Sequence, residues 1–213
     1  MSSLRRHIFW DWNGTLLDDT QAALDTLNDM LRRRGRQPMT MGFYRANFRF
    51  PVKPFYESIG MFDSRDDWDA VAREYHEVYE RQAKRLHPEA MEFLERIRAA
   101  GVEQSITSAL RQDLLERITA ELGVAKFMAH ICGTDNLNGA SKVETMRKFA
   151  ATLPADTEIT VIGDSLHDRE AAEAIGARCI LHAQGTHTLE RLRSAGARAV
   201  ATVPEAVEIA LLG

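Results

Sequence analysis

Short β-rich runs alternate with longer amphipathic runs along most of the chain, and this alternation limits the folds that the sequence can adopt. Strands separated by helices of this length are typical of βα units, in which successive strands lie parallel. We therefore expect an α/β fold, a Rossmann-like parallel sheet with helices on both faces. The expected strands are His7–Trp10, Glu103–Thr107, His130–Gly133, Glu158–Ile162, Arg178–His182 and Arg198–Thr202, and the expected helices between them are Glu89–Ala100, Arg111–Leu122, Lys142–Ala151, Asp168–Ile175, Leu189–Ser194 and Glu205–Leu212.

One stretch, residues 19–86, departs from this alternation. It holds two strong helical patterns, Gln21–Arg34 and Asp66–Leu86, and between them an aromatic and basic segment, Phe43–Ile59, without a convincing strand pattern. The simplest arrangement is an all-helical cap domain, residues 19–86, inserted after the first strand of a core domain formed by residues 1–18 and 87–213. The chain returns to the core near Pro88, because the residue before a proline is disfavoured in a helix.

The composition narrows the classes of protein. The 213 residues carry 27 Lys and Arg against 31 Asp and Glu, a formal net charge of −4. Because binding to nucleic-acid phosphates requires a basic excess, this balance argues against nucleic acid as a partner. No apolar run approaches the roughly 18–20 residues that span a bilayer, so no membrane association is expected. The two cysteines, Cys132 and Cys179, have no metal-type spacing; we expect a cytoplasmic protein, and the oligomeric state stays open.

Two expected strands run directly into an aspartate, Asp11 after the first strand and Asp164 after the fourth. This fold class places its ligand crevice at the C-terminal edge of the sheet, so the two carboxylates are expected to meet there. Buried carboxylates repel each other, and a divalent cation relieves the repulsion. Oxygen ligands alone suit Mg²⁺, which favours carboxylates together with a substrate phosphate. Either aspartate taken alone has a simpler interpretation, as the cap of the helix that follows it.

Other polar residues are expected near the same edge of the sheet. The turn Asn13–Thr15 can direct backbone amides at an anion, and Asp168 can face the site from a helix. Thr107 and Ser108 end another strand with hydroxyls that suit a phosphoryl oxygen, and Lys142 begins a helix. Taken singly, a lysine such as Lys142 is usually a solvated surface residue and a serine such as Ser108 a helix N-cap.

In this order the residues resemble the haloacid dehalogenase-like hydrolase superfamily, in particular its phosphoglycolate-phosphatase-like members with a helical cap after the first strand. The resemblance covers essentially the whole chain. The family's first motif, Asp-x-Asp-Gly-Thr-Leu, falls on residues 11–16, and its fourth, Gly-Asp-x-x-x-Asp, on residues 163–168; both are specific. The second motif, a strand ending in Ser or Thr, falls on Thr107 and the third, a single lysine, on Lys142. Asp18 matches the acidic residue common at the entry to the cap.

The resemblance implies a Mg²⁺-dependent phosphatase, a phosphoric monoester hydrolase of the EC 3.1.3 class, that acts through an aspartyl-phosphate intermediate. It assigns the role of nucleophile to Asp11. The residues implied around Mg²⁺ are Asp11, Asn13 through its backbone carbonyl, Asp164 and Asp168, and those implied around the phosphoryl group are Thr107 and Lys142. Ser108, beside Thr107, is a further candidate for binding the substrate from its place at the end of the strand.

Asn13 stands where the family carries the aspartate that serves as general acid and base. An amide forms hydrogen bonds but transfers no proton, and general acid–base catalysis contributes roughly 10²–10⁴-fold. Three interpretations stay open. The first is a phosphatase that is slow, uses a substitute proton carrier such as His167, or prefers a good leaving group. The second is a non-catalytic phospho-ligand-binding or regulatory protein, and the third is a C–X or C–P bond hydrolase of the same fold.

The segment between the two cap helices is expected to face the substrate. Arg45, Arg49 and Lys53 are interleaved there with aromatic residues. As a lid, this segment would exclude water and present basic side chains to a small phosphorylated metabolite such as phosphoglycolate. The alternative is that the aromatic residues form the core of the cap and the basic residues are solvated.

Overall fold

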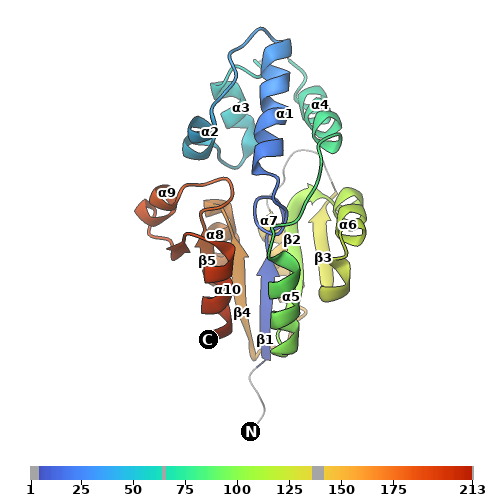
Figure 1. Cartoon of the computed structure of the whole chain (residues 1–213), viewed down its shortest axis with the longest axis vertical. Coiled ribbons are helices and arrows are strands. Elements are labelled where there is room, and N and C mark those ends of the chain that lie inside the picture. Colours follow the sequence, from blue (N-terminus) through green and yellow to red (C-terminus); the bar gives the residue numbers. More distant parts are fainter. Residues whose placement is uncertain (1–4, 64–65, 136–141, 213) are drawn as a thin grey trace.

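The computed structural model describes residues 5–63, 66–135 and 142–212. A six-stranded parallel sheet lies at the centre of this described part, in the order β3-β2-β1-β4-β5-β6 (Figure 1). The chain begins at a middle strand and extends first to one side and then to the other, so its connections diverge at the C-terminal ends of β1 and β4. The expected α/β fold is confirmed. The strands are β1 (Arg5–Trp10), β2 (Glu103–Arg111), β3 (His130–Thr134), β4 (Thr157–Gly163), β5 (Arg178–His182) and β6 (Ala199–Val200).

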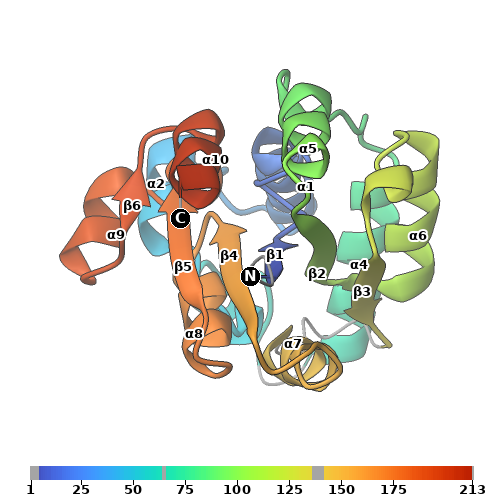
Figure 2. The ribbon, with the colours of Figure 1, turned by 90° about the horizontal axis from the view of Figure 1, so that it is seen from below.

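Helices cover both faces of the sheet (Figure 2). Successive residues of a strand point to opposite faces, so Ile8 and Trp10 enter one apolar core and Phe9 enters the other. The first face is covered by α5 (Ala90–Ala99), α6 (Gln112–Glu121) and α10 (Val203–Leu212) and the second by α7 (Lys142–Ala150) and α8 (Leu166–Glu173), while α9 (Leu189–Ser194) and the 3₁₀ helix η1 (Ala125–Phe127) lie in connections. In the described part of the chain, no helix combines the length and apolar character needed to cross a membrane.

A group of helices follows β1 and lies beyond the C-terminal ends of the strands (Figure 1). These helices share an apolar core of their own, formed by residues such as Leu27, Tyr44 and Phe55. We call them the cap; the domain bounds at residues 19 and 86 stay a prediction. The cap helices are α1 (Thr20–Arg33), α2 (Met41–Asn47), α3 (Val52–Ser58) and α4 (Trp68–Glu80).

The last cap helix is shorter than predicted. The pattern predicted a helix over Asp66–Leu86, but α4 ends at Glu80. The Nζ of Lys84 donates to the carbonyls of Tyr79 at 2.6 Å and Gln82 at 2.7 Å, and so satisfies carbonyls that a longer helix would bond to its own amides.

The two connections between cap and core lie side by side. Leu17 and Leu86 form an antiparallel bridge, and the backbone N–H of Asp18 donates to the carbonyl of Arg85 at 2.9 Å. The side chains of Asp18 and Arg85 also form an ion pair. The cap therefore leaves and re-enters the core at one place.

Candidate active site

Three aspartates meet where the strand order diverges. Asp11 follows β1, Asp164 follows β4, and Asp168 lies in the first turn of α8. All three are buried, and one carboxylate oxygen of each lies within 4.8 Å of the others. The structure thus brings together the aspartates that the sequence placed at this edge of the sheet.

Lys142, the first residue of α7, lies buried between two of these aspartates. Its Nζ donates to Asp11 Oδ1 at 2.7 Å and also to Asp168 Oδ1. Burial disfavours the ammonium form, but the two carboxylates outweigh this effect and raise the pKa of Lys142 above its ordinary value. Lys142 is therefore a fixed cation, and three ionised carboxylates beside it leave an excess of negative charge.

The environment acts differently on the three carboxyl groups. Burial, with repulsion from Asp168, raises the pKa of Asp164 to about 7. Burial also raises the pKa of Asp11 well above its usual value, although Lys142 opposes the shift. Burial acts in the same direction on Asp168, but Lys142 and the hydrogen bond from Ser165 overcome it and lower the pKa of Asp168. Asp168 is thus ionised and paired with Lys142, whereas the ionised forms of Asp11 and Asp164 would be stabilised by a further cation.

The loop after β5 holds Asp164 in place. Thr186 donates to Asp164 Oδ2 from its Oγ1 at 2.6 Å and from its backbone N–H. Two glycines let this carboxylate lie against the backbone: a Cβ on Gly14 would be 2.7 Å from Asp164 Oδ2, and a Cβ on Gly185 would overlap the same atom. Gly14 also has a φ of +78°, which favours glycine.

A short chain of hydrogen bonds orients Asp11. Thr15 Oγ1 donates to Asp11 Oδ2 at 3.3 Å, and His182 Nε2 lies 3.1 Å from Thr15 Oγ1. Burial lowers the pKa of His182 to about 3, so the ring is neutral. Because Nδ1 accepts the backbone N–H of Gln184 at 3.3 Å, the proton of the neutral ring lies on Nε2 and points to Thr15.

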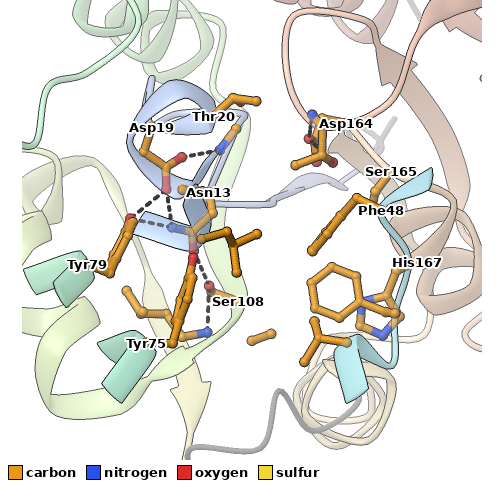
Figure 3. A pocket seen from close by; sticks show the side chains of 18 of the residues that line it. Asn13, Asp19, Thr20, Phe48, Tyr75, Tyr79, Ser108, Asp164, Ser165 and His167 are labelled. Carbon is orange, nitrogen blue, oxygen red and sulfur yellow. Dashed lines mark hydrogen bonds between the residues drawn. The ribbon is translucent and has the colours of Figure 1, made fainter. Parts of the chain in front are cut away.

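Asn13 is surrounded by polar groups from both core and cap (Figure 3). Its Nδ2 donates to Asp19 Oδ2 at 2.8 Å and to the hydroxyl oxygen of Tyr79 at 2.9 Å. Tyr79 in turn donates to Asp19 Oδ2 at 2.5 Å. On the other side of the amide, Ser108 Oγ donates to Asn13 Oδ1 at 3.4 Å. The amide nitrogen of Asn13 is thus held by Asp19 and Tyr79, and its oxygen can accept a further hydrogen bond.

Asp19 and Tyr79 are site residues that the sequence analysis did not single out. We matched the neighbouring Asp18 to the family's acidic residue, but Asp18 pairs with Arg85 near the surface. Asp19 is 3% exposed and also accepts the backbone N–H of Gly14 at 2.7 Å. Burial raises the pKa of Asp19, although its three hydrogen bonds oppose the shift. The available signal for Asp19 was a second carboxylate beside Asp18 at a helix start; Tyr79, far along the chain, offered none.

The two hydroxyls of β2 have different surroundings. Thr107 is fully buried, and its Oγ1 has no hydrogen-bond partner among the described residues. A buried hydroxyl without a partner is costly. Ser108 contacts Asn13 and, unlike Thr107, lines the cavity described next.

A cavity of about 140 Å³ lies between the cap and Asp11. On the core side its lining is polar and includes Asn13, Lys142 and Asp164. On the cap side the lining is mostly aromatic. This aromatic wall consists of Tyr44, Phe48, Phe50, Tyr56, Trp68 and Tyr75.

The structure does not bring the expected basic residues of the cap to this cavity. Arg45 Nη2 donates to the carbonyl of Gln184 at 2.9 Å and so joins the cap to the core. The Nζ of Lys53 lies over the ring of Phe62, 5.6 Å from its centroid, and Arg49 is exposed. The aromatic residues of the same segment supply both cap core and cavity wall.

His167, the suggested substitute proton carrier, lies across the cavity from Asn13 (Figure 3). Its ring stacks on Phe50 with 4.7 Å between centroids. Burial, with the nearby charge of Lys142, lowers the pKa of His167 to about 4. The ring is therefore neutral near pH 7 and contacts the cap.

Comparison with known proteins places this geometry in a family. The family profile described as haloacid dehalogenase-like hydrolase matches residues 8–182. A phosphoglycolate phosphatase of Rhodobacter capsulatus is 23% identical over 184 residues, which cover 84% of each chain. Two solved structures share the fold: a predicted phosphatase from Clostridium acetobutylicum (TM-score 0.81, 19% identity, 99% of this chain and 100% of that chain) and a haloacid dehalogenase-like hydrolase of Streptococcus pneumoniae (TM-score 0.73, 19% identity, 98% and 99%). Because the profile matches most of its length, the chain belongs to the haloacid dehalogenase-like hydrolase family.

Proposed function

We propose that this enzyme is a Mg²⁺-dependent phosphatase that transfers the phosphoryl group of a small substrate to Asp11 and then to water. The observation that carries the proposal is the buried cluster of Asp11, Asp164 and Asp168 around Lys142, at the edge of the sheet and beside a cavity. The similarity to a phosphoglycolate phosphatase supports a small phosphorylated metabolite as the substrate.

The donor set fits Mg²⁺, because it offers oxygen ligands only. The carboxylates of Asp11 and Asp164, with the backbone carbonyl of Asn13, would hold the ion, and Asp168 would support the site through Lys142. Burial raises the pKa values of Asp11 and Asp164, so a bound cation would stabilise their ionised forms. When bound, Mg²⁺ neutralises charge on the phosphoryl oxygens.

The residues around Asp11 prepare it to attack phosphorus. Hydrogen bonds from Lys142 and Thr15 hold its two oxygens. The ammonium of Lys142 also offsets the repulsion between this carboxylate and an anionic substrate. Ser108 Oγ, which lines the cavity, would donate to a phosphoryl oxygen, whereas Thr107 does not line it. The cap would exclude bulk water during the transfer.

Asn13 limits proton transfer in this proposal. Its Oδ1 can accept a hydrogen bond from the attacking water but cannot keep the proton. We expect slow turnover, because general acid–base catalysis contributes about 10²–10⁴-fold.

Release of inorganic phosphate, with and without Mg²⁺, tests the proposal on p-nitrophenyl phosphate, phosphoglycolate and sugar phosphates. Asp11→Asn removes the nucleophile and is expected to abolish turnover. Asp113→Asn, which changes an exposed carboxylate in α6, is the matched control and is expected to retain it. If no substrate is turned over while calorimetry still detects phosphate and Mg²⁺ binding, the proposal fails in favour of a non-catalytic phospho-ligand-binding protein.

A further inference from the structure

The cavity offers a bound molecule two different surfaces. The phosphoryl end is marked by Asp11, Asp164 and Lys142, and the opposite end is the aromatic wall of the cap. Among the described lining residues, Lys142 is the one Lys or Arg, and it already pairs with Asp11 and Asp168. A carboxylate or a second phosphate on the substrate would find no Lys or Arg on the aromatic wall, where His76 of α4 is the one titratable nitrogen among the described lining residues of the cap, and burying a charge without a partner is costly. The wall favours an uncharged, flat, apolar group.

The size of the cavity limits that group to one small ring at most. The cavity measures about 140 Å³, and the phosphoryl group would occupy part of this space. An apolar protein cavity of about 150 Å³ binds one benzene molecule, so nothing larger than a single ring fits beside the phosphoryl group.

The side chain at position 13 limits the chemistry of the leaving group. The amide of Asn13, held by Asp19 and Tyr79, can form hydrogen bonds but cannot transfer a proton to the leaving oxygen. The site therefore favours a leaving group that departs as an anion. A phenol, with a pKa of about 10, does so far more readily than an alcohol, whose acidity is close to that of water at about 15.7.

We propose that the substrate of this site is an aryl phosphate, the phosphate monoester of a small uncharged phenol, with its ring on the aromatic wall and its phosphoryl group at Asp11. This inference rests on the proposed phosphatase function and names its substrate class.

The two steps balance without a general acid. In the first, an oxygen of ionised Asp11 forms a bond to phosphorus, the bond from phosphorus to the phenolic oxygen breaks, and the phenolate leaves with the electron pair and takes a proton from solvent. In the second, water attacks phosphorus, the bond to Asp11 breaks, and the carboxylate is restored. Both protons of the water leave on dihydrogen phosphate.

Four phosphate monoesters separate the effect of the ring from that of the leaving group. Phenyl phosphate has both features, benzyl phosphate keeps the ring but leaves as an alkoxide, and phosphoglycolate has neither. O-phosphotyrosine adds charges to a phenol, and it separates a free small phenol from the tyrosine of a protein. We expect kcat/KM for phenyl phosphate to exceed that for benzyl phosphate by about 10²–10⁴-fold, the contribution of the missing acid. Both phosphoglycolate and O-phosphotyrosine are expected to be poorer substrates than phenyl phosphate.

A charge placed on the wall tests the binding surface separately. Val52, at the start of α3, lines the cavity, and Val52→Lys is expected to raise KM for phenyl phosphate and to lower it for phosphoglycolate. Glu57→Lys introduces a lysine on an exposed position of the same helix and should leave both KM values unchanged. Melting curves of the two variants show whether each is folded.

Acetyl phosphate, which has no ring and needs no proton on its leaving group, separates the two proposals. If benzyl phosphate, phosphoglycolate or O-phosphotyrosine is turned over as well as phenyl phosphate, the aryl assignment is overturned and the phosphatase stands. The same holds if acetyl phosphate alone is hydrolysed. If no phosphate is released from any of the five compounds, the aryl assignment is overturned, and if p-nitrophenyl phosphate and the sugar phosphates are also left intact, the phosphatase function is overturned with it.

Discussion

Replacing Asp19 with alanine removes a buried acceptor that three donors share. The residue is 3% exposed and accepts hydrogen bonds from Asn13 Nδ2 at 2.8 Å, Gly14 N at 2.7 Å and the Tyr79 hydroxyl at 2.5 Å. A hydrogen bond to a charged group contributes about 1.5–3 kcal/mol, so the three together contribute at most about 4.5–9 kcal/mol. The cost of burying the carboxylate, which also raises its pKa, offsets part of this. We therefore expect Asp19→Ala to lower the free energy of unfolding by about 3–5 kcal/mol.

Urea unfolding followed by tryptophan fluorescence measures this loss. Asp18→Ala is the matched control, because the neighbouring carboxylate is 33% exposed and pairs with an Arg85 side chain that is 77% exposed. A surface pair of this kind contributes about 0–1 kcal/mol. Equal losses in the two variants, or a loss below about 1 kcal/mol for Asp19→Ala, would refute the assignment of Asp19 as a structural anchor of the site.

Four further outcomes are expected. The exchange variant Asn13→Asp/Asp19→Asn keeps the net charge, and the hydrogen bond between the two side chains can form in the opposite direction. Its stability should therefore stay within about 1 kcal/mol of wild type, while hydrolysis of benzyl phosphate rises. Lys142→Met leaves buried carboxylates without their cation and is expected to abolish phosphate release and to cost about 3–5 kcal/mol in urea unfolding. Mg²⁺ should raise the melting temperature of the wild type but not of Asp164→Asn, as measured by differential scanning fluorimetry. The pKa of His182 is about 3 in the folded protein and about 6.5 in the unfolded chain. The stability that His182 contributes is therefore present above pH 6.5 and is lost by about 1.4 kcal/mol per pH unit as the pH falls towards 3. Urea unfolding should show the stability difference between wild type and His182→Gln shrinking at that rate.

Each of these outcomes has a contrary result. A stable exchange variant without any gain on benzyl phosphate would show that proton donation is not the missing step. Phosphate release by Lys142→Met at the wild-type rate would show that phosphate release does not depend on Lys142. An equal Mg²⁺ response in Asp164→Asn would place the ion elsewhere, and a constant difference between wild type and His182→Gln across pH 6.5 to 4.5 would mean that His182 is not buried neutral.

The α/β fold could be predicted because strands and helices each carry a local pattern. The apolar run of β1, for example, is followed at once by Asp11, and that order alone indicates a strand ending at a site. The end of α4 could not be predicted, because nothing in the helical pattern of residues 66–86 shows that Arg85 bonds to Asp18. A helix that continued through residue 85 would lose this pairing.

In the candidate site, too, some residues could be predicted from the sequence and others could not. The carboxylates and Lys142 lie at strand and helix ends, where the fold class itself defines their position. Asp19 and Tyr79 contact each other across a long stretch of chain, so the pairing depends on how α4 is placed against the core. The direction of Arg45 and of the aromatic residues near it depends on the same placement, and the sequence pattern alone left both orientations open.

The cap leaves and re-enters the core through linkers that are joined at Leu17 and Leu86. For the sheet, the whole insertion therefore acts as a tight turn between β1 and α5, whatever its length. The entropic cost of closing a loop rises only slowly with the number of residues in it. A change in the length of the cap therefore need not shift the strand register or the positions of Asp11, Asp164 and Asp168, whereas Asn13 and Gly14 depend on Asp19 at the start of the cap.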